Sequence, residues 1–373
     1  MKFKIAKKDI STILGRVQGI TGRKSNLAIT ANVLIKGEGQ GISFVATDLE
    51  TGFEGHYTAD VEREGAITIN AKKLFEIVQN FPGEEVLIEE IERQWIEIKN
   101  NNIVYHIVGM SPDDFPDVPR VDEVTFTRVA TGGVREMIEK TVMIQAPSDE
   151  KRAHITGVCF ERIQKDGQNL MRMVSTDGRR LCKVDVEIGE DANFVPGESV
   201  IVPKKGLMEA AKILDKEEEH VEVGVKDNYL IFKMTKETVI IGLLEGDFPE
   251  YEQVIEKDDT YDIEVDRKLF SMMLKRMSIL SSDSYNSVIF NFADNRLEVT
   301  ATNPDLGESK EDMAIAFERD EVEVAFNPKY LIDTLNVIND ERILVNLRDN
   351  HHPCLVEGVE EKRFLSIIMP MKI

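Results

Sequence analysis

Three short landmarks recur in the same order along the chain, and such internal repetition constrains the fold more than any local pattern does. The first landmark is a small residue, a threonine and an acid or amide at the end of a strand-like run. Its copies are Ala46-Thr47-Asp48, Ser175-Thr176-Asp177 and Ala301-Thr302-Asn303. They lie 129 and then 126 positions apart, so the repeating unit has the length of a domain.

The second and third landmarks keep this spacing. The second is the end of a predicted strand followed directly by the lysine-containing first turn of a predicted helix. Its copies lie at residues 69–74, 202–207 and 326–331. The third is Asp-Phe-Pro, at 114–116 and 247–249, and an acidic connector follows it each time, whereas the third copy of the repeat ends the chain. A length of 373 residues also suits two or three domain cores. We predict three repeated domains, over residues 1–122, 123–255 and 256–373.

Two hydrophobic periods alternate within each repeat. The spacing of amphipathic helices is followed by Ile10, Ile13, Leu14 and Val17, and again by Leu269, Met272, Met273, Met277 and Leu280. β-branched segments that alternate with charges, such as 95–98 and 220–223, predict half-exposed strands. Six helices are predicted, over 7–19, 70–80, 133–145, 203–214, 266–280 and 327–338. Each repeat is therefore expected to be an α+β domain with two helices packed against antiparallel sheets.

The charge of the chain is segregated. A net charge of −22 argues against nucleic-acid binding, because an acidic surface repels the phosphate backbone. On the six predicted helices, however, Lys and Arg number 15 and Asp and Glu number 7, which leaves a net charge of about −30 for the rest of the chain. If the helices share one face, that face is a basic surface on an acidic body and can hold a polyanion.

Other features indicate a globular cytoplasmic protein. Apolar residues make up 42% and charged residues 31% of the chain. No apolar run approaches the roughly 18 residues of a membrane span, and the N-terminus lacks the apolar stretch of a signal peptide. The cysteines, Cys159, Cys182 and Cys354, are odd in number and widely spaced, so we expect reduced packing residues rather than a disulfide framework or a zinc cluster.

No residue pattern supports catalysis. The glycine cluster at 37–41 lacks a Walker lysine and lies between predicted strands, where a turn is favoured. His351-His352-Pro353-Cys354 has no second ligand pair at zinc spacing, and Glu217-Glu218-Glu219 fits a solvated loop. We expect no enzyme activity, no cofactor and no metal. The alternative to a polyanion-binding protein is a repeat-built scaffold for proteins that does not bind DNA. Such a scaffold would have a protein-binding pocket but no basic surface.

Five segments give the chain a resemblance to the bacterial DNA polymerase III beta subunit family, the sliding clamps. They are Met1-Lys2-Phe3, residues 176–181, 200–206 and 247–251, and Met369-Pro370-Met371, and the resemblance spans nearly the whole chain. It implies three clamp domains per chain and a homodimer whose two chains pair head to tail into a ring with twelve helices lining its hole. Such a processivity factor encircles duplex DNA and tethers the replicative polymerase; other partners are the clamp loader and further clients.

The resemblance also implies three sets of site residues. Sequence-independent contacts to DNA phosphates are expected from Arg23, Lys24, Lys72, Lys73, Lys204 and Lys205. A pocket for short apolar client peptides matches Ile155, Thr176, Gly178, Arg179, Arg180, Leu181, Pro249, Val254, Asn327, Tyr330, Met369, Pro370 and Met371. The dimer contacts match Tyr105 and Ile107 against Ile279 and Leu280 of the second chain.

This sequence departs from the family's pattern at three places. The run 26–30 after Arg23 replaces a Thr-Leu-Pro-Ile-Leu-like run that many relatives have in a DNA-facing loop. Ala153 and His154 stand where some relatives have aromatic residues, and the chain ends in Lys372-Ile373 rather than Arg-Leu.

Overall fold

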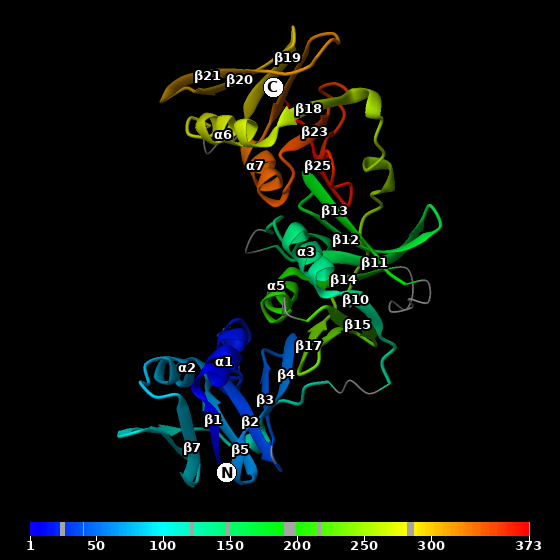
Figure 1. Ribbon diagram of the computed structural model, residues 1–373. Coiled ribbons are helices and arrows are strands. Elements are labelled where there is room, and N and C mark those ends of the chain that lie inside the picture. The colour runs from blue at the N-terminus through cyan, green and yellow to red at the C-terminus, as the bar shows by residue number, and fades with distance from the viewer. Residues whose placement is uncertain are drawn as a thin grey trace. The chain divides into compact units, whose positions relative to one another are not determined.

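The computed structural model describes residues 1–22, 27–39, 41–119, 123–146, 150–189, 199–214, 218–281 and 287–372 (Figure 1). The chain packs into two compact units. The first consists of Met1–Arg135 and Val202–Leu243 with the segment Ile188–Glu198, and the second of Glu136–Glu187 and Leu244–Ile373 with the segment Ser199–Ile201. The division falls inside the predicted middle repeat.

Seven α-helices lie within the described residues, and six of them were predicted. The predicted ones are α1 (Lys7–Thr21), α2 (Ala71–Gln79), α3 (Thr131–Thr141), α5 (Lys204–Ile213), α6 (Arg267–Met277) and α7 (Pro328–Val337). The seventh, α4 (Ala153–Thr156), is a single turn that the hydrophobic pattern does not reveal. Within the units, α1 contacts α2 and α5, and α6 contacts α7. Figure 1 shows α1 and α2 side by side.

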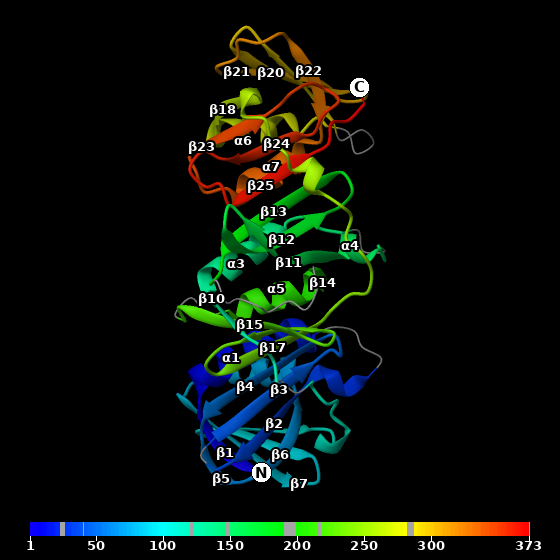
Figure 2. The same ribbon diagram turned by 90° about the vertical axis from the view of Figure 1, so that its right-hand side faces the viewer.

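The first unit contains two antiparallel sheets. The smaller has the order β5 (Asp60–Arg63), β1 (Lys2–Ala6), β7 (Glu85–Glu92), β8 (Trp95–Asn100), β9 (Ile103–Val108). The larger has the order β10 (Thr127–Ala130), β15 (His220–Lys226), β16 (Tyr229–Lys233), β17 (Glu237–Gly242), β4 (Thr51–Thr58), β3 (Gly41–Thr47), β2 (Asn32–Glu38), β6 (Gly65–Asn70). Strands β17 and β4, which belong to different repeats, pair with Ile240 opposite Gly52 (Figure 2).

The second unit follows the same plan. Its larger sheet has the order β14 (Ser199–Pro203), β11 (Gly157–Lys165), β12 (Gln168–Thr176), β13 (Arg180–Glu187), β25 (Phe364–Ile368), β24 (Cys354–Gly358), β23 (Arg342–Asn346), β18 (Asp262–Asp266). Its smaller sheet has the order β21 (Gly307–Ala314), β20 (Arg296–Asn303), β19 (Val288–Ala293), β22 (Val322–Phe326). Strand β13 of the middle repeat pairs with β25 of the last (Figure 2).

These shared sheets explain why the compact units do not coincide with the repeats. An isolated repeat would leave the edges of β4, β13, β17 and β25 unpaired, and an unpaired edge strand invites association with other chains. Pairing β4 with β17 and β13 with β25 satisfies those backbone groups within the chain. Half of the middle repeat therefore folds with each neighbouring repeat.

The first landmark has the same hydrogen bonds in its first two copies. The hydroxyl of Thr47 accepts from Leu49 N at 3.0 Å, and that of Thr176 accepts from Gly178 N at 3.1 Å. The carboxylate of Asp48 accepts from the N–H groups two and three residues on, and that of Asp177 does the same. In the third copy Asn303 accepts at the same offsets. Short polar side chains that hydrogen-bond to nearby backbone groups stabilise such turns. The repeat is therefore present in the structure as well as in the sequence.

The second landmark is a strand end followed by a helix cap. Asn70 accepts a hydrogen bond from Lys73 N at the start of α2, and Asn327 accepts one from Lys329 N at the start of α7. Pro328 is the first residue of α7, a position that lacks an intrahelical N–H partner in any case. The helix predicted to begin at residue 203 begins one residue later, and Pro203 is the N-cap residue of α5.

The apolar faces of the helices were only partly predicted. In α1 the predicted residues Ile10, Ile13, Leu14 and Val17 are buried. In α6 the predicted residues Met273 and Met277 are buried together with Phe270 and Leu274, whereas the predicted residues Leu269 and Met272 are 53% and 47% exposed. Two helical apolar patterns overlap in this segment, and the packing selects the one that contains Phe270.

Two helical glycines of the first unit provide a matched pair of stability tests. A Cβ at Gly206 of α5 would lie 2.4 Å from the Ile241 methyl carbon Cγ2, whereas a Cβ at Gly15 of α1 would lie 3.7 Å from the Phe75 ring. Gly206→Ala is expected to lower the free energy of unfolding by about 1–3 kcal/mol through overpacking. Gly15→Ala is expected to raise it by about 0.5–1 kcal/mol through helix propensity. Urea unfolding of both variants measures the two changes; equal shifts of the same sign would contradict the assigned packing.

The remaining sequence features fall in packing or turn positions. All three cysteines are buried and none forms a disulfide, and burial raises the pKa of Cys159 and of Cys354 to about 12. The glycine cluster joins β2 to β3, with Gly39 at a φ of 58°. His352 lies in a loop, where its Nδ1 is 2.8 Å from the Asp349 carboxylate.

Candidate functional site

A largely apolar cavity of about 220 Å³ lies in the second unit. Its walls come from the turn between β12 and β13, the connector 248–254 that follows the second Asp-Phe-Pro landmark, the end of β25, and α4. The lining residues are His154, Thr176, Gly178, Arg179, Arg180, Leu181, Phe248, Pro249, Glu250, Tyr251, Val254, Ile367 and Met369. We refer to this cavity as the connector pocket.

The structure brings eight of the thirteen predicted peptide-binding residues together in the connector pocket. They are Thr176, Gly178, Arg179, Arg180, Leu181, Pro249, Val254 and Met369. The other five are Ile155, Asn327, Tyr330, Pro370 and Met371, and they lie outside its lining. Ile155 is buried in α4, Asn327 caps α7, and Met371 N donates to Ala325 O at 2.8 Å.

Arg180 anchors the turn that forms one wall of the pocket. Its Nε donates to Asp177 at 3.0 Å, and its Nη1 donates to Asp333 of α7 at 2.8 Å. Its guanidinium carbon also lies 4.3 Å from the centroid of the Tyr330 ring. Because the Arg180 side chain is only 5% exposed, these contacts satisfy a nearly buried charge and fix the turn against α7.

The connector forms the opposite wall because its side chains pack against those of strands in the larger sheet. Tyr251 is buried with Cys159, Val174 and Leu181, and Phe248, Val254 and Ile255 pack against the same cluster. The Tyr251 hydroxyl donates to Glu161, and burial raises the pKa of both groups. A neutral phenol that donates to this carboxyl group keeps the ring in place.

An ion-paired cluster lies farther along the same sheet. Arg172 donates to both carboxylate oxygens of Asp185, at 2.6 and 2.9 Å, and Lys183 donates to Asp185 at 2.9 Å. Burial works against the charge of Asp185, but the two cations outweigh it and lower the pKa of that carboxyl group. The cluster secures strands β12 and β13, which carry the turn of the pocket.

Five lining residues were not predicted, namely His154, Phe248, Glu250, Tyr251 and Ile367. A signal for three of them was present, because Phe248, Glu250 and Tyr251 belong to the segment 247–251, which contains Pro249 and carries the family resemblance. Ile367 lies opposite Leu181 in the pairing of β25 with β13, a register that the sequence does not specify. His154 lies on α4, the helix that the hydrophobic pattern does not reveal.

The first repeat carries a counterpart of the connector pocket. Residues Ile29, Leu34, Val45 and Phe115 form a buried cluster there, and Val118 packs against it. The first two repeats can be aligned on their strand starts and landmarks. In this alignment the residues that correspond to Cys159, Val174, Phe248 and Tyr251 are, in that order, Leu34, Val45, Phe115 and Val118. Ile29 holds the position of His154, three residues before the strand, and is only 5% exposed. The corresponding site in the first repeat therefore has the buried side chain of Ile29 where the connector pocket has the half-buried His154.

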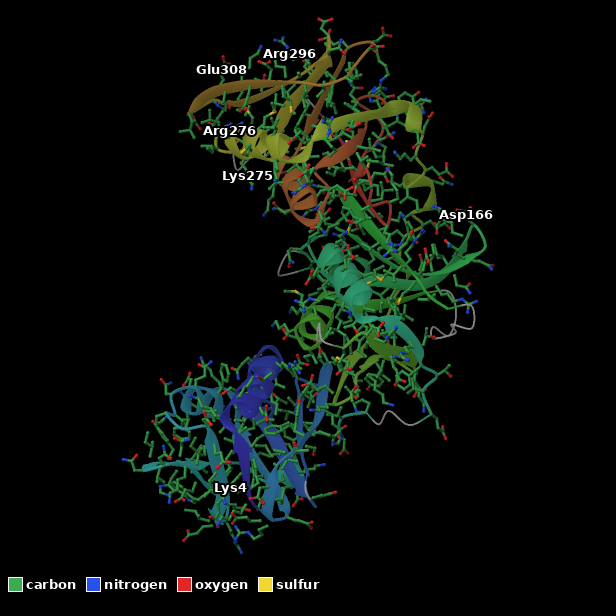
Figure 3. All side chains as sticks on the ribbon, viewed as in Figure 1. Lys4, Asp166, Lys275, Arg276, Arg296 and Glu308 are labelled. Atoms are coloured by element: carbon green, nitrogen blue, oxygen red, sulfur yellow. The ribbon has the colours of Figure 1, made fainter. Side chains whose placement is uncertain are left out.

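The predicted DNA contacts differ in exposure. Lys72, Lys73 and Lys205 are exposed on α2 and α5, whereas Lys204 is only 6% exposed, so its ammonium group is not presented to solvent. Arg23 and Lys24 lie outside the described residues. Further exposed lysines on the helices, all without a side-chain partner in the described part of the chain, are Lys8, Lys268, Lys275 and Lys329. Lys275 extends from α6 beside Arg276, which pairs with Glu311 of β21 (Figure 3).

The predicted dimer residues lie at two surfaces, one in each unit. Tyr105 and Ile107 are on β9, the edge strand of the smaller sheet, and they line a groove of about 610 Å³ between β9 and α2. Tyr105 is 43% exposed. In the second unit Ile279 is 74% exposed just beyond the end of α6, and Leu280 is half-buried.

The described residues hold neither a cluster of metal ligands nor a membrane-spanning helix. No group of three or more His, Cys, Asp or Glu side chains is placed to hold a metal ion there. No helix in this part of the chain is long and apolar enough to cross a membrane.

Three family models of the DNA polymerase III beta subunit match the chain. The N-terminal domain model matches residues 1–119, the central domain model 128–250 and the C-terminal domain model 252–372. The beta sliding clamp of Vibrio cholerae serotype O1 is 29% identical over 374 residues, with 100% of both chains covered. That of Pseudomonas putida is 28% identical over 376 residues, again with 100% of both chains covered.

Solved structures agree with these matches. The DNA polymerase III subunit beta from Pseudomonas aeruginosa has a TM-score of 0.92 at 26% identity, with 100% of both chains covered. The Caulobacter crescentus beta sliding clamp has a TM-score of 0.92 at 26% identity, with 100% of this chain and 99% of that chain covered. Three repeated α+β domains of this kind define a sliding clamp, a class of protein that is not an enzyme. The chain belongs to the DNA polymerase III beta subunit family.

Proposed function

We propose that two copies of this chain close into a ring around duplex DNA and hold client proteins, the replicative polymerase among them, through the connector pocket. The connector pocket carries this proposal, because it is a largely apolar cavity whose lining contains eight of the thirteen predicted peptide-binding residues. An open cleft with apolar walls and few polar groups is typical of a binding site for apolar anchor residues. The clamp loader and other clients are expected to use the same pocket, in the cytoplasm.

The exposed lysines support a role in DNA binding. Five of the helices carry exposed lysines, while the chain as a whole has a net charge of −22. Lysine suits sliding, because its mobile point charge meets phosphates without preferring any base. We propose Lys72, Lys73 and Lys205 as phosphate contacts from the predicted set, with Lys8, Lys268, Lys275 and Lys329 as additions. Arg23 and Lys24 remain proposed contacts.

The exposed apolar residues support ring closure by dimerisation. Strand β9 carries Val104, Tyr105 and Val108 at 43%, 43% and 55% exposure, which is unusual for an edge strand that faces water. We propose that Ile279 and Leu280 of a second copy enter the groove between β9 and α2. Two such contacts, related by twofold symmetry, close the ring.

The test of the function is retention on DNA. The wild-type protein, once loaded, is expected to remain on closed circular DNA and to leave linear DNA by its ends. Direct binding should be weak, indifferent to sequence and weaker with added salt, because phosphate contacts release counterions. A scaffold that does not bind DNA would show no difference between circular and linear DNA, and this outcome would favour the alternative.

A charge-removal variant tests the lysines themselves. Replacing Lys72, Lys205 and Lys275 with Gln is expected to reduce the salt dependence of binding, by about 0.9 in the slope of log K against log salt for each phosphate that is no longer neutralised. The control replaces the exposed lysines Lys36, Lys99 and Lys236, which lie on β2 and β8 and before β17. Fluorescence anisotropy across a salt series measures both slopes. Equal slopes for the two variants would remove these lysines from the interface.

A further inference from the structure

A second cavity, of about 440 Å³, lies in the second unit and shares no lining residue with the connector pocket. Its apolar part comes from Ile255, from Leu344 of β23 and from Leu365 of β25, and its other eight lining side chains are charged. We refer to it as the cationic cavity, because five of these eight are cationic in a chain whose net charge is −22. The five are Lys165, Arg172, Lys183, Lys257 and Lys362.

Carboxylates of the wall balance the cations at one end of the cationic cavity. Lys257 donates to Asp262 at 2.6 Å and to Glu357 at 2.7 Å. Its ammonium nitrogen is also 3.0 Å from the Asp259 carboxylate. Lys362 donates to Glu357 at 2.8 Å. Two basic and three acidic side chains meet here, so this end has no excess of positive charge.

The other end contains the ion-paired cluster of Arg172, Lys183 and Asp185, in which two cations share one carboxylate. Arg172 and Lys183 are only 5% and 7% exposed. Glu161 lies opposite Arg172 on β11, and its carboxyl group accepts from the Tyr251 hydroxyl. Burial lowers the pKa of Lys183 although Asp185 is in contact, so the ammonium group is not fully compensated. An anion in the cavity supplies the missing compensation.

Lys165 adds a positive charge at the same end. It is the last residue of β11, next to Asp166 at the tip of the hairpin with β12 (Figure 3). Its side chain is exposed and has no side-chain partner in the described part of the chain. The cationic cavity therefore offers one buried and one exposed ammonium group to an anion.

The first repeat has no equivalent of this cationic end. Ser43, Glu54 and His56 hold the positions of the arginine, the lysine and the aspartate of the ion-paired cluster, counted from the landmark threonine and its strand partner. The His56 ring is 3.4 Å from the Glu54 carboxylate, and both side chains reach solvent. The same strands form in the first repeat without buried cations, so the fold itself does not require them.

We propose that the cationic cavity binds a small anion that carries phosphate groups, with Lys183 and Lys165 as its main contacts. Lysine binds phosphate as a point charge, and a buried lysine attracts it more strongly because less water screens the pair. The cavity volume falls within the roughly 300–1,000 Å³ of small-molecule sites, so more than one phosphate group can enter. This site goes beyond the proposed clamp function and does not depend on it.

Inorganic pyrophosphate and a nucleoside triphosphate share this chemistry and serve as the two probes. Calorimetric titration of the full-length protein, with a chelator present and at constant ionic strength, is expected to show one site per chain for each probe. Tighter binding of the triphosphate would support a phosphate site in which the nucleoside contacts the apolar part of the cavity. Equal affinities would support recognition of the phosphate groups alone.

Two variants test the contacts. Lys183→Met removes the buried charge and keeps the hydrogen bonds between Arg172 and Asp185, so the chain should fold, as its melting temperature will show. It is expected to bind pyrophosphate about tenfold more weakly or worse, because a contact to a buried charge is lost. Lys165→Gln changes an exposed residue and is expected to weaken binding about two- to fivefold.

The control is Lys310→Gln, which removes a 62% exposed lysine of β21 outside the cationic cavity. It should bind both probes as the wild type does, and all three variants should still be retained on circular DNA. Wild-type affinity in Lys183→Met and Lys165→Gln would overturn the assigned contacts. No binding of either probe to the wild type, or binding of a glutamate-rich peptide alone, would overturn the phosphate site. Lys165→Gln decides the matter by itself if Lys183→Met does not fold.

Discussion

An Ile279→Ala/Leu280→Ala variant is expected to be monomeric at micromolar concentration, where the wild type is a dimer. Ile279 is 74% exposed, so its truncation costs the folded chain little, whereas in the proposed dimer both side chains enter the groove beside Tyr105. Truncating two apolar anchors at the centre of an interface costs several kcal/mol, about 2–4 for each strong anchor. Sedimentation velocity measures the change, and the variant should also leave circular DNA quickly.

The control for this variant is Leu269→Ala/Met272→Ala. These two residues are exposed on α6, the helix after which Ile279 follows, and they lie outside the proposed contact. Their truncation removes a similar apolar area and should leave the dimer intact. A variant at Ile279 and Leu280 that stays dimeric would contradict the proposed interface, and loss of the dimer in the control would extend the interface along α6.

Local patterns predicted the repeat and its helices because both depend on short-range physics. The turns at Thr47 and Thr176 need only a threonine and an aspartate that bond their own backbone. The caps at Asn70 and Asn327 need only one side-chain oxygen at a helix start. Such signals lie within a few residues of the structure they specify.

Features that depend on distant contacts could not be predicted in the same way. The sequence of α6 fits two apolar faces, and only packing around Phe270 decides between them. Strands β17 and β4 lie in different repeats, and no hydrophobic period specifies which sheet edges pair. Lys204 is the first residue of α5, as Ala71 is of α2, and both are buried, but a lysine in a basic helix start does not reveal that burial.

The connector pocket shows both situations. The turn residues Gly178 and Leu181 lie in the segment 176–181 that carries the family resemblance, the connector residue Pro249 lies in the third landmark, and all three were predicted. His154 and Ile367 reach the pocket through a single helical turn and through strand register, which the sequence does not specify. The difference between the buried Ile29 of the first repeat and the half-buried His154 of the connector pocket becomes visible only once the two sites are compared.

Deletion of residues 369–373 is expected to reduce peptide binding at least tenfold without unfolding the chain. Met369 is 42% exposed and lines the connector pocket, so its loss removes an apolar wall that peptide anchors contact. Strand β25 ends at Ile368 and keeps its pairing with β13 and β24. The deletion removes two backbone hydrogen bonds, from Met369 N to Arg179 O and from Met371 N to Ala325 O, which costs about 1–3 kcal/mol of stability. Titration calorimetry with a short peptide that carries a glutamine and a leucine-phenylalanine end measures the binding.

The matched control is a shorter deletion of residues 372–373, which keeps Met369, Met371 and both hydrogen bonds. It should bind the peptide as the wild type does. The longer deletion should remain a dimer, because the proposed interface lies at Tyr105, Ile107, Ile279 and Leu280. Equal peptide affinity for the longer deletion and the wild type would remove Met369 from the binding site. Unfolding of the longer deletion at room temperature would instead show that residues 369–373 are part of the core, because the removal of two terminal hydrogen bonds is too small a change to unfold the chain.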